Sequence, residues 1–366
     1  MILFFNASES ARAALDDLMG KGEFKDISEA ITAAILSYHA ISRAVVGNTS
    51  SRVAEIRTDE ISRPKPATTK LEVSADETVS ASSRVPDLFA LDASTRVQRA
   101  EYPDSEKPML SVEDITPKEW FFGQYNRLFP AKVTARGLMR LLDKSPTGVP
   151  VEEAASTISY AACGLGDLLA DFDRRYLRGR DAALAAAFPT TAIHGAQSRA
   201  RFGNQFVAAL KQGKLIGLPA SLRLIHSDDS KNPRIVLTKQ GMDFAMLQNN
   251  ILDAGSERTF QKFSQAEIQF LLSHITEFVP EELAAYVAII DGIEDGASAP
   301  NELDEFLRTK FDLADEAAIT APFLSTQRSG AISRMVELNL IAREKQGLRV
   351  TYVVTHPGKC FRNQIH

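Results

Sequence analysis

Residues 234–241 have the sequence RIVLTKQG, and this short stretch decides how the rest of the chain is interpreted. Arg234–Leu237 is mostly apolar and β-branched, which predicts a strand, and Thr238 belongs to the residue types that cap helix N-termini. A helix is therefore expected to begin at Thr238. Upstream, Leu222–Ile225 predicts a partner strand, because the polar run His226–Pro233 between the two strands is typical of a turn.

A second stretch repeats this pattern. Residues 352–358, YVVTHPG, match residues 235–241, IVLTKQG, at an offset of 117 residues (355 − 238). This offset is too long for a solenoid repeat and predicts two copies of one domain type. Chance similarity over seven positions is the alternative. Duplication is favoured because a predicted helix and a basic cluster precede both copies. For the second copy, this helix lies around Ile332–Asn339.

The charge of the chain is unevenly distributed. The 366 residues include 42 Lys and Arg against 47 Asp and Glu, a net charge of −5, which by itself argues against a nucleic-acid partner. However, residues 196–239 contain 8 basic and 2 acidic side chains, and residues 325–362 contain 7 and 2. Because screening limits electrostatic reach to about 8 Å at physiological salt, these two basic clusters matter more to a phosphate backbone than the overall charge.

Each cluster follows the order helix, short basic hairpin and further helix, and so resembles a winged helix-turn-helix domain. In this family a helix enters the DNA major groove and the hairpin, or wing, reaches the neighbouring backbone. Carried onto the first copy, the recognition helix would be Ala196–Leu210. The resemblance implies that the helix contacts bases through Ser198, Arg199, Arg201, Asn204 and Gln205. It also implies phosphate contacts from Lys211 and Lys214, and wing contacts from Lys231 and Arg234.

In the second copy the resemblance places Thr326, Gln327, Arg328 and Arg334 on the outward face of the helix, and Arg343, Lys345 and Arg349 on the wing. The alternative for either copy is an ordinary solvated helix and hairpin face. For the second copy an assembly role is a further alternative, because residues 257–324 are strongly acidic and would repel a duplex.

The first residues resemble a ribbon-helix-helix domain, on the strength of Asp16-Asp17-Leu18, of Gly20 and Gly22, and of Ser28–Ile31 at a helix start. The family pairs two strands into one ribbon, which implies a homodimer, with base reading from the strand and a phosphate at the helix start held by Ser28. Strand alternation puts Ile2 and Phe4 beside Asn6 on the reading face. Since only Asn6 is polar there, dimerisation is the favoured role and base reading the alternative.

Residues 48–110 are rich in Ser, Thr, Pro and mixed charge without any sustained period. They predict a flexible linker, because such a composition buries too little apolar surface to offset its chain entropy. The apolar island Val85–Leu91 is either a docking motif for a protein partner or an incidental patch.

No catalytic, metal or cofactor motif is found. The six histidines lack a ligand spacing such as HExxH, and Gly164-Leu165-Gly166-Asp167 is only half of a dinucleotide-binding pattern. Cys163 and Cys360 read as thiols of a reducing compartment. No stretch is apolar enough to cross a bilayer and the N-terminus lacks a secretory pattern, so a cytoplasmic location is expected. We expect no enzyme activity; a nuclease built from dispersed carboxylates is the alternative.

Together these features predict a mainly α protein with small β-hairpins (α+β). Its parts would be a ribbon-helix-helix domain (1–47), a flexible linker (48–110) and two winged-helix domains (111–255 and 256–366). The expected function is that of a dimeric, sequence-specific binder of double-stranded DNA, a transcriptional repressor acting by occupancy. The alternatives are a plasmid or mobile-element partition or replication-initiation protein and a winged-helix adaptor that binds proteins.

Overall fold

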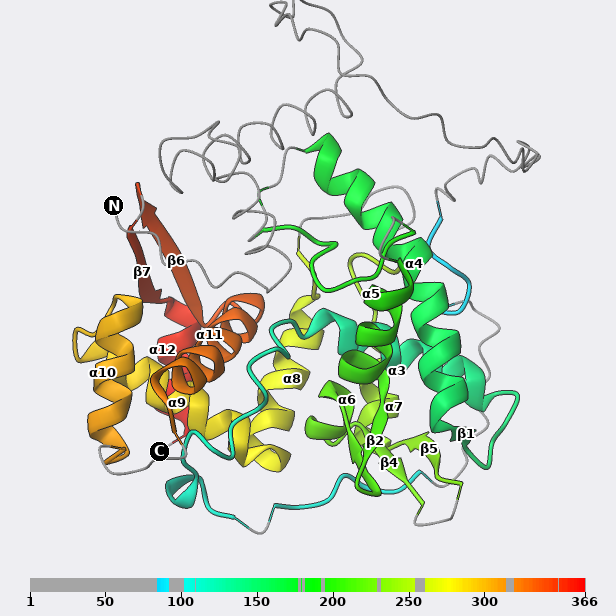
Figure 1. The fold of residues 1–366 in the computed structure, drawn as a ribbon, viewed down its shortest axis with the longest axis horizontal. Coiled ribbons are helices and arrows are strands. Elements are labelled where there is room, and N and C mark those ends of the chain that lie inside the picture. The colour runs from blue at the N-terminus through cyan, green and yellow to red at the C-terminus, as the bar shows by residue number, and fades with distance from the viewer. Residues whose placement is uncertain are drawn as a thin grey trace, which may run out of the picture. The chain divides into compact units, whose positions relative to one another are not determined.

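The computed structural model describes residues 84–91, 102–108, 110–176, 179, 182–191, 195–228, 232–253, 261–313, 319–347 and 349–365 (Figure 1). The chain divides into Met1–Asp76 and a compact unit, Glu77–His366, and all described residues belong to the second. The predicted ribbon-helix-helix domain, with Asn6 and Ser28, lies outside the described residues. The described unit is mainly helical with small antiparallel sheets, as expected for an α+β chain.

The first half of the unit contains helices α3 to α7 and strands β1 to β5. Their bounds are α3 Phe129–Leu142, β1 Val149–Pro150, α4 Val151–Arg175, α5 Gly195–Phe202, a π-helical turn Gly203–Val207, β2 Ala209–Lys211, β3 Lys214–Ile216, α6 Leu218–Ser221, β4 Ile225–Ser227, β5 Arg234–Leu237 and α7 Lys239–Met246. A short 3₁₀ turn, Val112–Asp114, precedes them.

The second half contains helices α8 to α12 and the β6–β7 hairpin. Their bounds are α8 Gln265–Phe278, α9 Pro280–Glu294, α10 Pro300–Lys310, α11 Ala321–Glu337, β6 Ile341–Gln346, β7 Arg349–Val354 and α12 His356–Gln364. Helices α9, α10, α11 and α12 all have a proline in the first turn, where the missing N–H has no helical partner to lose.

The two halves share one order of elements. In the first half, β1 pairs antiparallel with β5 (Val149 opposite Ile235), giving the sheet order β1-β5-β4. In the second half, β6 pairs with β7, and the Tyr352 N–H donates to the Ser298 carbonyl (2.9 Å), so the segment before α10 takes the place of β1. The order helix, short strand segment, helix, helical segment, hairpin and helix therefore occurs in both halves, and the first half contains in addition the β2–β3 hairpin and α6 before its β4–β5 hairpin.

The repeated sequence has the same geometry in both copies. The Thr238 hydroxyl accepts from the Gly241 N–H (3.0 Å) and starts α7, and the Thr355 hydroxyl accepts from the Gly358 N–H (3.1 Å) and starts α12. A Cβ on either glycine would lie 1.9 or 2.0 Å from a backbone carbonyl oxygen, that of Leu224 or of Leu340. Glycine is thus required at both positions by the close approach of the residue just before the first strand of each hairpin, β4 or β6.

Several sequence predictions are corrected in detail. The predicted helix Ala196–Leu210 ends at Phe202, because the chain passes through the π-helical turn and then pairs as the β2–β3 hairpin. Leu222–Leu224 is not a strand, since Arg223 has a φ of +54° and makes a turn before β4. Val151–Arg175 is one continuous helix, α4, although it contains Gly164 and Gly166.

Two segments inside the predicted linker pack on the compact unit. In 84–91, Phe89 is fully buried and its carbonyl accepts from Arg136 (3.2 Å). In 102–108, the Ser105 hydroxyl donates to the Arg223 carbonyl (2.6 Å). The flexible-linker prediction is therefore wrong for these segments, and the apolar island 85–91 docks within its own chain.

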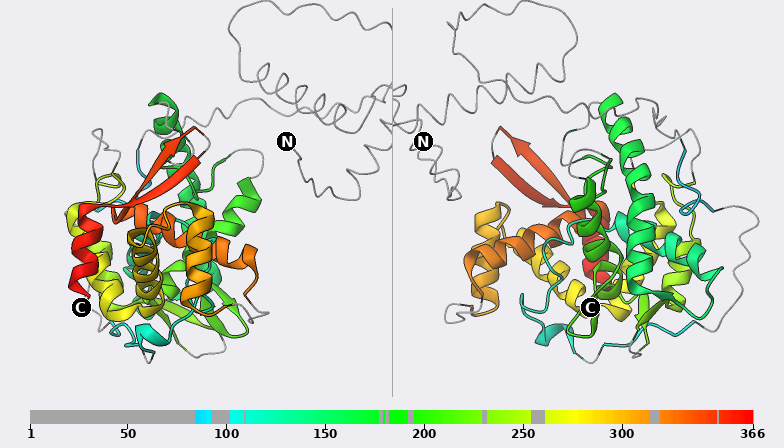
Figure 2. Two further views of the ribbon diagram at one scale, coloured as in Figure 1. Left: turned by 90° about the vertical axis from the view of Figure 1, so that its left-hand side faces the viewer. Right: turned by 45° about the vertical axis from the view of Figure 1, so that its right-hand side comes forward.

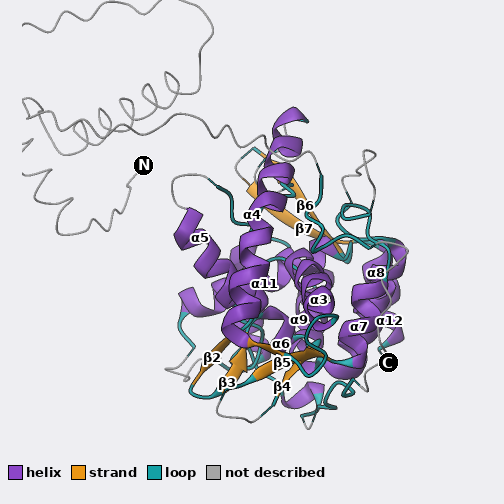
Figure 3. Cartoon of the chain, turned by 90° about the vertical axis from the view of Figure 1, so that its right-hand side faces the viewer, coloured by secondary structure: helices purple, strands orange, loops and turns teal. Residues whose placement is uncertain are grey.

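The small sheets lie at opposite ends of the unit. Figure 3 shows β2 to β5 at one end and the β6–β7 hairpin at the other, and in both views of Figure 2 that hairpin projects beyond the helices. One apolar core, which includes Leu138, Phe206, Ile289 and Met335, runs through both halves. Among the described residues, none of the helices is both long and apolar enough to cross a membrane.

Candidate nucleic-acid interface

An open groove of about 1130 Å³ lies between α5, α11 and the β6–β7 hairpin. Figure 1 shows the elements that supply its lining: α5 lies to one side of α11, and the β6–β7 hairpin lies to the other. Its lining includes four basic side chains, Arg127, Arg201, Arg343 and Lys345, and none of the described residues that line it is acidic. Its other polar side chains are amides and hydroxyls, namely Gln124, Asn126, Gln205, Ser325, Thr326, Ser329, Ser333 and Tyr352.

The α5 side of the groove holds part of the first predicted cluster. Arg201 is exposed at the end of α5, and Gln205 lies in the π-helical turn that follows. The Gln205 Nε2 donates to the Gln124 Oε1 (2.7 Å), so an amide pair joins α5 to residues 120–128. Arg201 and Gln205 are thus the members of the predicted helix that line the groove.

The remaining predicted residues of that helix lie elsewhere. The Ser198 hydroxyl donates to the Gly195 carbonyl (3.2 Å) within α5, and Asn204 is exposed outside the groove lining. Arg199 lies beside Cys163 of α4. Burial raises the pKa of the Cys163 thiol, and the guanidinium of Arg199 partly opposes this effect.

The first wing does not accompany its helix. Lys211 and Lys214 are exposed on the β2–β3 hairpin, at the end of the unit away from β6–β7 (Figure 3). Arg234 of β5 donates from Nε to the Gly148 carbonyl (3.0 Å), which holds it next to β1 in the separate β1-β5-β4 sheet. None of the three lines the groove, and Lys231 lies outside the described residues. The sequence places the first helix beside its own hairpin. In the structure, Arg201 and Gln205 instead line the groove together with residues of the β6–β7 hairpin, the predicted second wing.

The second wing forms the opposite wall. Arg343 donates from Nη2 to the Ser333 hydroxyl of α11 (2.7 Å), and Lys345 is exposed further along β6. Arg349 is also exposed, on β7, but is not part of the groove lining. Because the hairpin pairs over six residues on each strand, it holds Arg343 and Lys345 at fixed register.

A strap, Trp120–Leu128, covers the helix α11 that the sequence presents as the second recognition helix. Gly123 lies so close to α11 that a Cβ there would be 2.2 Å from the Thr326 carbonyl oxygen. The buried Gln327 side chain accepts from the Gly123 N–H (2.5 Å) and donates to the Trp120 carbonyl (3.2 Å). Gln327 is thus bound to the strap and does not face solvent, contrary to expectation.

Arg334 is also corrected. It is fully buried and makes two hydrogen bonds to Glu282 of α9 (2.5 and 2.7 Å) and one to the Tyr125 carbonyl of the strap. Burial alone would lower the pKa of Arg334, but the Glu282 carboxylate holds it above its usual value. The same burial, next to that carboxylate, raises the pKa of the neighbouring Tyr286 phenol. Arg334 therefore anchors the strap and is shielded from a duplex.

Arg328 is a further residue of α11 that was expected to face outward. It is 4% exposed and donates to both carboxylate oxygens of Asp304 on α10 (2.6 and 3.1 Å). A buried guanidinium paired in this way has no access to DNA in this conformation. What α11 offers the groove instead is a row of hydroxyl groups, Ser325, Thr326, Ser329 and Ser333.

Glu337, at the end of α11, fixes the other end of the strap. Its carboxylate accepts from the Leu128 N–H (2.6 Å) at the start of α3 and pairs with Lys262 (2.5 Å). A carboxylate at a helix N-terminus is favourable because it meets unpaired N–H groups. The Arg127 Nε lies 3.6 Å from the same carboxylate, so Arg127 is oriented by it at the edge of the groove.

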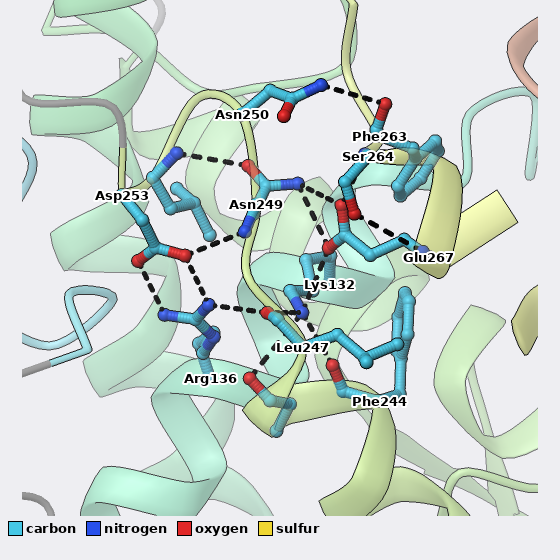
Figure 4. Close-up of polar contacts among 12 residues, drawn as sticks. Lys132, Arg136, Phe244, Leu247, Asn249, Asn250, Asp253, Phe263, Ser264 and Glu267 are labelled. Carbon is cyan, nitrogen blue, oxygen red and sulfur yellow. Dashed lines mark hydrogen bonds and ion pairs between the residues drawn. The ribbon is translucent and has the colours of Figure 1, made fainter.

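A buried polar network joins the two halves (Figure 4). Lys132 of α3 donates to the Phe244 and Leu247 carbonyls (2.5 and 2.7 Å) at the end of α7 and pairs with Glu267 of α8 (2.9 Å). Burial lowers the pKa of Lys132 to about 8, although the Glu267 carboxylate opposes the shift. Lys132 therefore stays protonated at neutral pH and satisfies carbonyls that α7 leaves unpaired.

Sequence reasoning missed the strap residues Gln124, Asn126 and Arg127. In the structure, buried and exposed residues alternate from Phe121 to Asn126 with the period of an extended chain, but in the sequence the adjacent aromatic residues Phe121 and Phe122 hide this alternation. The strap was overlooked because its partners lie about two hundred residues later in the chain, as with the 204-residue separation of Gly123 and Gln327.

No group of three or more potential metal ligands occurs among the described residues. Comparison with known proteins identifies no matching family model, no similar curated protein and no similar solved structure. The function is therefore argued from the chemistry of the groove itself.

Proposed function

We propose that the chain is a sequence-specific binder of double-stranded DNA, acting by occupancy as a transcriptional regulator. The observation that carries the proposal is the groove, which gathers Arg127, Arg201, Arg343 and Lys345 without a described acidic side chain. In a chain of net charge −5 such a gathering is a local exception, and it creates a positive potential that attracts a phosphate backbone.

The fold supports the same proposal. In a winged helix, the strand after the first helix is expected to pair with the outer strand of the wing, which gives a three-stranded sheet. β1 and β5 pair in this way. The second half repeats it with Ser298, β7 and β6. The proposal is thus of two winged-helix domains fused into one unit, in which the first supplies the recognition helix and the second the wing.

The proposal is tested by fluorescence anisotropy with random-sequence duplexes between 50 and 300 mM salt. Across this range the Debye length falls by a factor of about 2.5. Each phosphate neutralised contributes about −0.9 to the log–log slope, so Arg201, Arg343 and Lys345 together predict a slope of no more than about −3. Arg201→Ala and Lys345→Ala should each weaken binding, and Lys345→Ala should reduce the slope by about one unit.

Lys359→Ala is the matched control, because Lys359 is exposed on α12 and does not line the groove. It should leave binding unchanged. A parent protein that binds no duplex at 50 mM salt would contradict the proposal and favour the protein-binding adaptor.

Partition or replication initiation is the second candidate, favoured by the tandem duplication. Two winged-helix units fixed together by the Lys132–Glu267 and Arg223–Glu281 pairs present one surface of constant geometry to iterated sites. Sequencing the genomic fragments that the protein enriches separates the candidates. A repressor selects an operator at a promoter, whereas a partition or initiation protein selects repeated sites near an origin.

A further inference from the structure

The two walls of the groove carry different chemistry. The wall made by α11 and β6 presents short hydroxyls with Arg343 and Lys345. The wall made by α5 and the strap presents amides, Gln124, Asn126 and Gln205, beside Arg201. Hydroxyls and lysine recognise phosphate without regard to sequence, whereas Gln and Asn pair with adenine, and Arg with guanine, through two hydrogen bonds at once.

We infer that the Gln124–Gln205 amide pair, with Arg201, is the base-reading element of the protein, and that the β6–β7 wing holds the phosphate backbone. This inference rests on the proposed function. It assigns the recognition of bases to a cluster of which Gln124 lies on the strap, a segment that a winged helix does not normally use to contact bases. It also means that α11 does not contact bases.

The strap holds Gln124 rigidly enough to read bases. The residues on either side are anchored: the Gly123 N–H donates to Gln327, and the Tyr125 carbonyl accepts from the buried Arg334. Gln124 itself is exposed, so its backbone is fixed while its amide reaches the groove. Preorganisation of this kind lowers the conformational entropy lost on binding.

Gln205 is held in a similar way on the opposite segment. It lies in the π-helical turn between the buried Phe202 and Phe206. The Phe206 carbonyl accepts from the Thr134 hydroxyl of α3 (2.7 Å), which fixes the turn to the core. Gln124 and Gln205 thus each lie next to residues whose backbone is hydrogen-bonded to the buried core.

The bond between the two amides also sets which atoms meet a ligand. It uses the oxygen of Gln124 and an N–H of Gln205. The nitrogen of Gln124 and the oxygen of Gln205 are then presented together, one as donor and one as acceptor. Adenine offers the complementary pair in the major groove, the N7 acceptor and the N6 donor, so adenine is the base expected opposite this pair.

The test compares two duplexes at one salt concentration: the best site that the parent protein selects from a random pool, and a scrambled version of that site. Gln124→Ala and Gln205→Ala should each lose about 5- to 140-fold on the selected site and little on the scrambled one. Together they should lose less than the product of the two effects, because the residues share a bond.

Lys345→Ala provides the contrast within the groove. It should weaken both duplexes by the same factor and lower the salt slope by about one unit. Gln124→Met retains the length and the exposed position of the side chain but removes the amide without adding a charge. It should therefore lose the selected site while its unfolding midpoint stays at the parent value, which separates reading from folding.

Two results overturn different claims. If the parent protein binds no duplex, the proposed function fails and the inference fails with it. If the parent discriminates between the two duplexes but Gln124→Ala and Gln205→Ala weaken both equally, the function stands and the inference is overturned, since the amides then act as backbone contacts only.

Discussion

At the scale of single residues, Asp253 is a carboxylate at the end of the first half whose titration is coupled to a buried arginine. Its oxygens accept from Arg136 (3.0 and 2.7 Å), which also donates to the Leu247 carbonyl (2.8 Å). Burial raises the pKa of Asp253, but the hydrogen bonds from Arg136 and from the Asn249 N–H outweigh it, and the pKa lies below the usual 3.8. The pair thus favours the charged form.

Asp253→Asn should lower the free energy of unfolding at pH 7 by about 3 kcal/mol, because the buried Arg136 guanidinium loses its counter-charge. Since the native pKa is depressed, the unfolded chain binds the proton more readily. The stabilisation is present above about pH 3.8 and is lost as the pH falls through the native pKa. The cost of the substitution should therefore shrink between pH 5 and pH 3, as measured by urea unfolding.

Asp171→Asn is the control for this experiment. Asp171 pairs with Arg174 on the exposed face of α4, where ion pairs contribute less than about 1 kcal/mol. It should change stability little at either pH. A cost of Asp253→Asn that is identical at pH 7 and pH 3 would contradict the assignment of a charged native carboxylate.

Gly123 is a second residue with a specific expectation. A Cβ there would lie 2.2 Å from the Thr326 carbonyl oxygen, so Gly123→Ala should push the strap from α11 and cost about 1–3 kcal/mol of unfolding free energy. Gly164→Ala is the matched control, because its Cβ would meet only the Pro86 side chain, at 3.6 Å. In the helix α4 it should stabilise by up to about 1 kcal/mol, so a similar loss in both variants would contradict the close packing.

At the scale of elements, the two wing-to-helix junctions should behave as equivalents. Thr238 and Thr355 each cap a helix through a glycine N–H three residues later. Thr238→Ala and Thr355→Ala should each cost about 1 kcal/mol in denaturant unfolding. Thr157→Ala, at an exposed position inside α4, should cost nothing. If only one of the two cap variants is destabilised, the copies are not equivalent.

These junctions are also where the sequence is most informative about the fold. The predicted helix start at Thr238 and the strand Arg234–Leu237 are confirmed, because caps and β-branched strands are local signals, and the matching residue Thr355 also starts a helix. Gly164 and Gly166 obscured the continuity of α4. The helix tolerates Gly166 because Pro189 packs so closely that a Cβ would lie 2.0 Å from its carbonyl oxygen.

The candidate site was less accessible from sequence than the fold. Arg201, Gln205, Arg343 and Lys345 were predicted and line the groove. The burial of Arg328 and Arg334 was not foreseen, because their fate depends on carboxylates 24 and 52 residues away. Charge pattern identifies candidate cations, but whether a cation faces solvent or a partner is decided by tertiary packing.

At the scale of the whole molecule, the described unit is complete enough to be tested apart from the first 76 residues. Glu77–His366 is compact, and its core spans both halves. The sequence assigns dimerisation to residues 1–47. The chain from Glu77 onward should therefore bind a single half-site with the affinity and salt slope of the full chain, because the groove cations all lie within it.

What the shortened chain should lose is avidity. Two linked units hold the second half-site at high effective concentration, so the full chain should bind a paired site about 10²- to 10⁴-fold more tightly than a single one, and the shortened chain should not. Analytical ultracentrifugation should give a dimer of the 40.1 kDa chain and a monomer of the shortened one. A monomeric full chain, or a shortened chain that still dimerises, would contradict the assignment of pairing to residues 1–47.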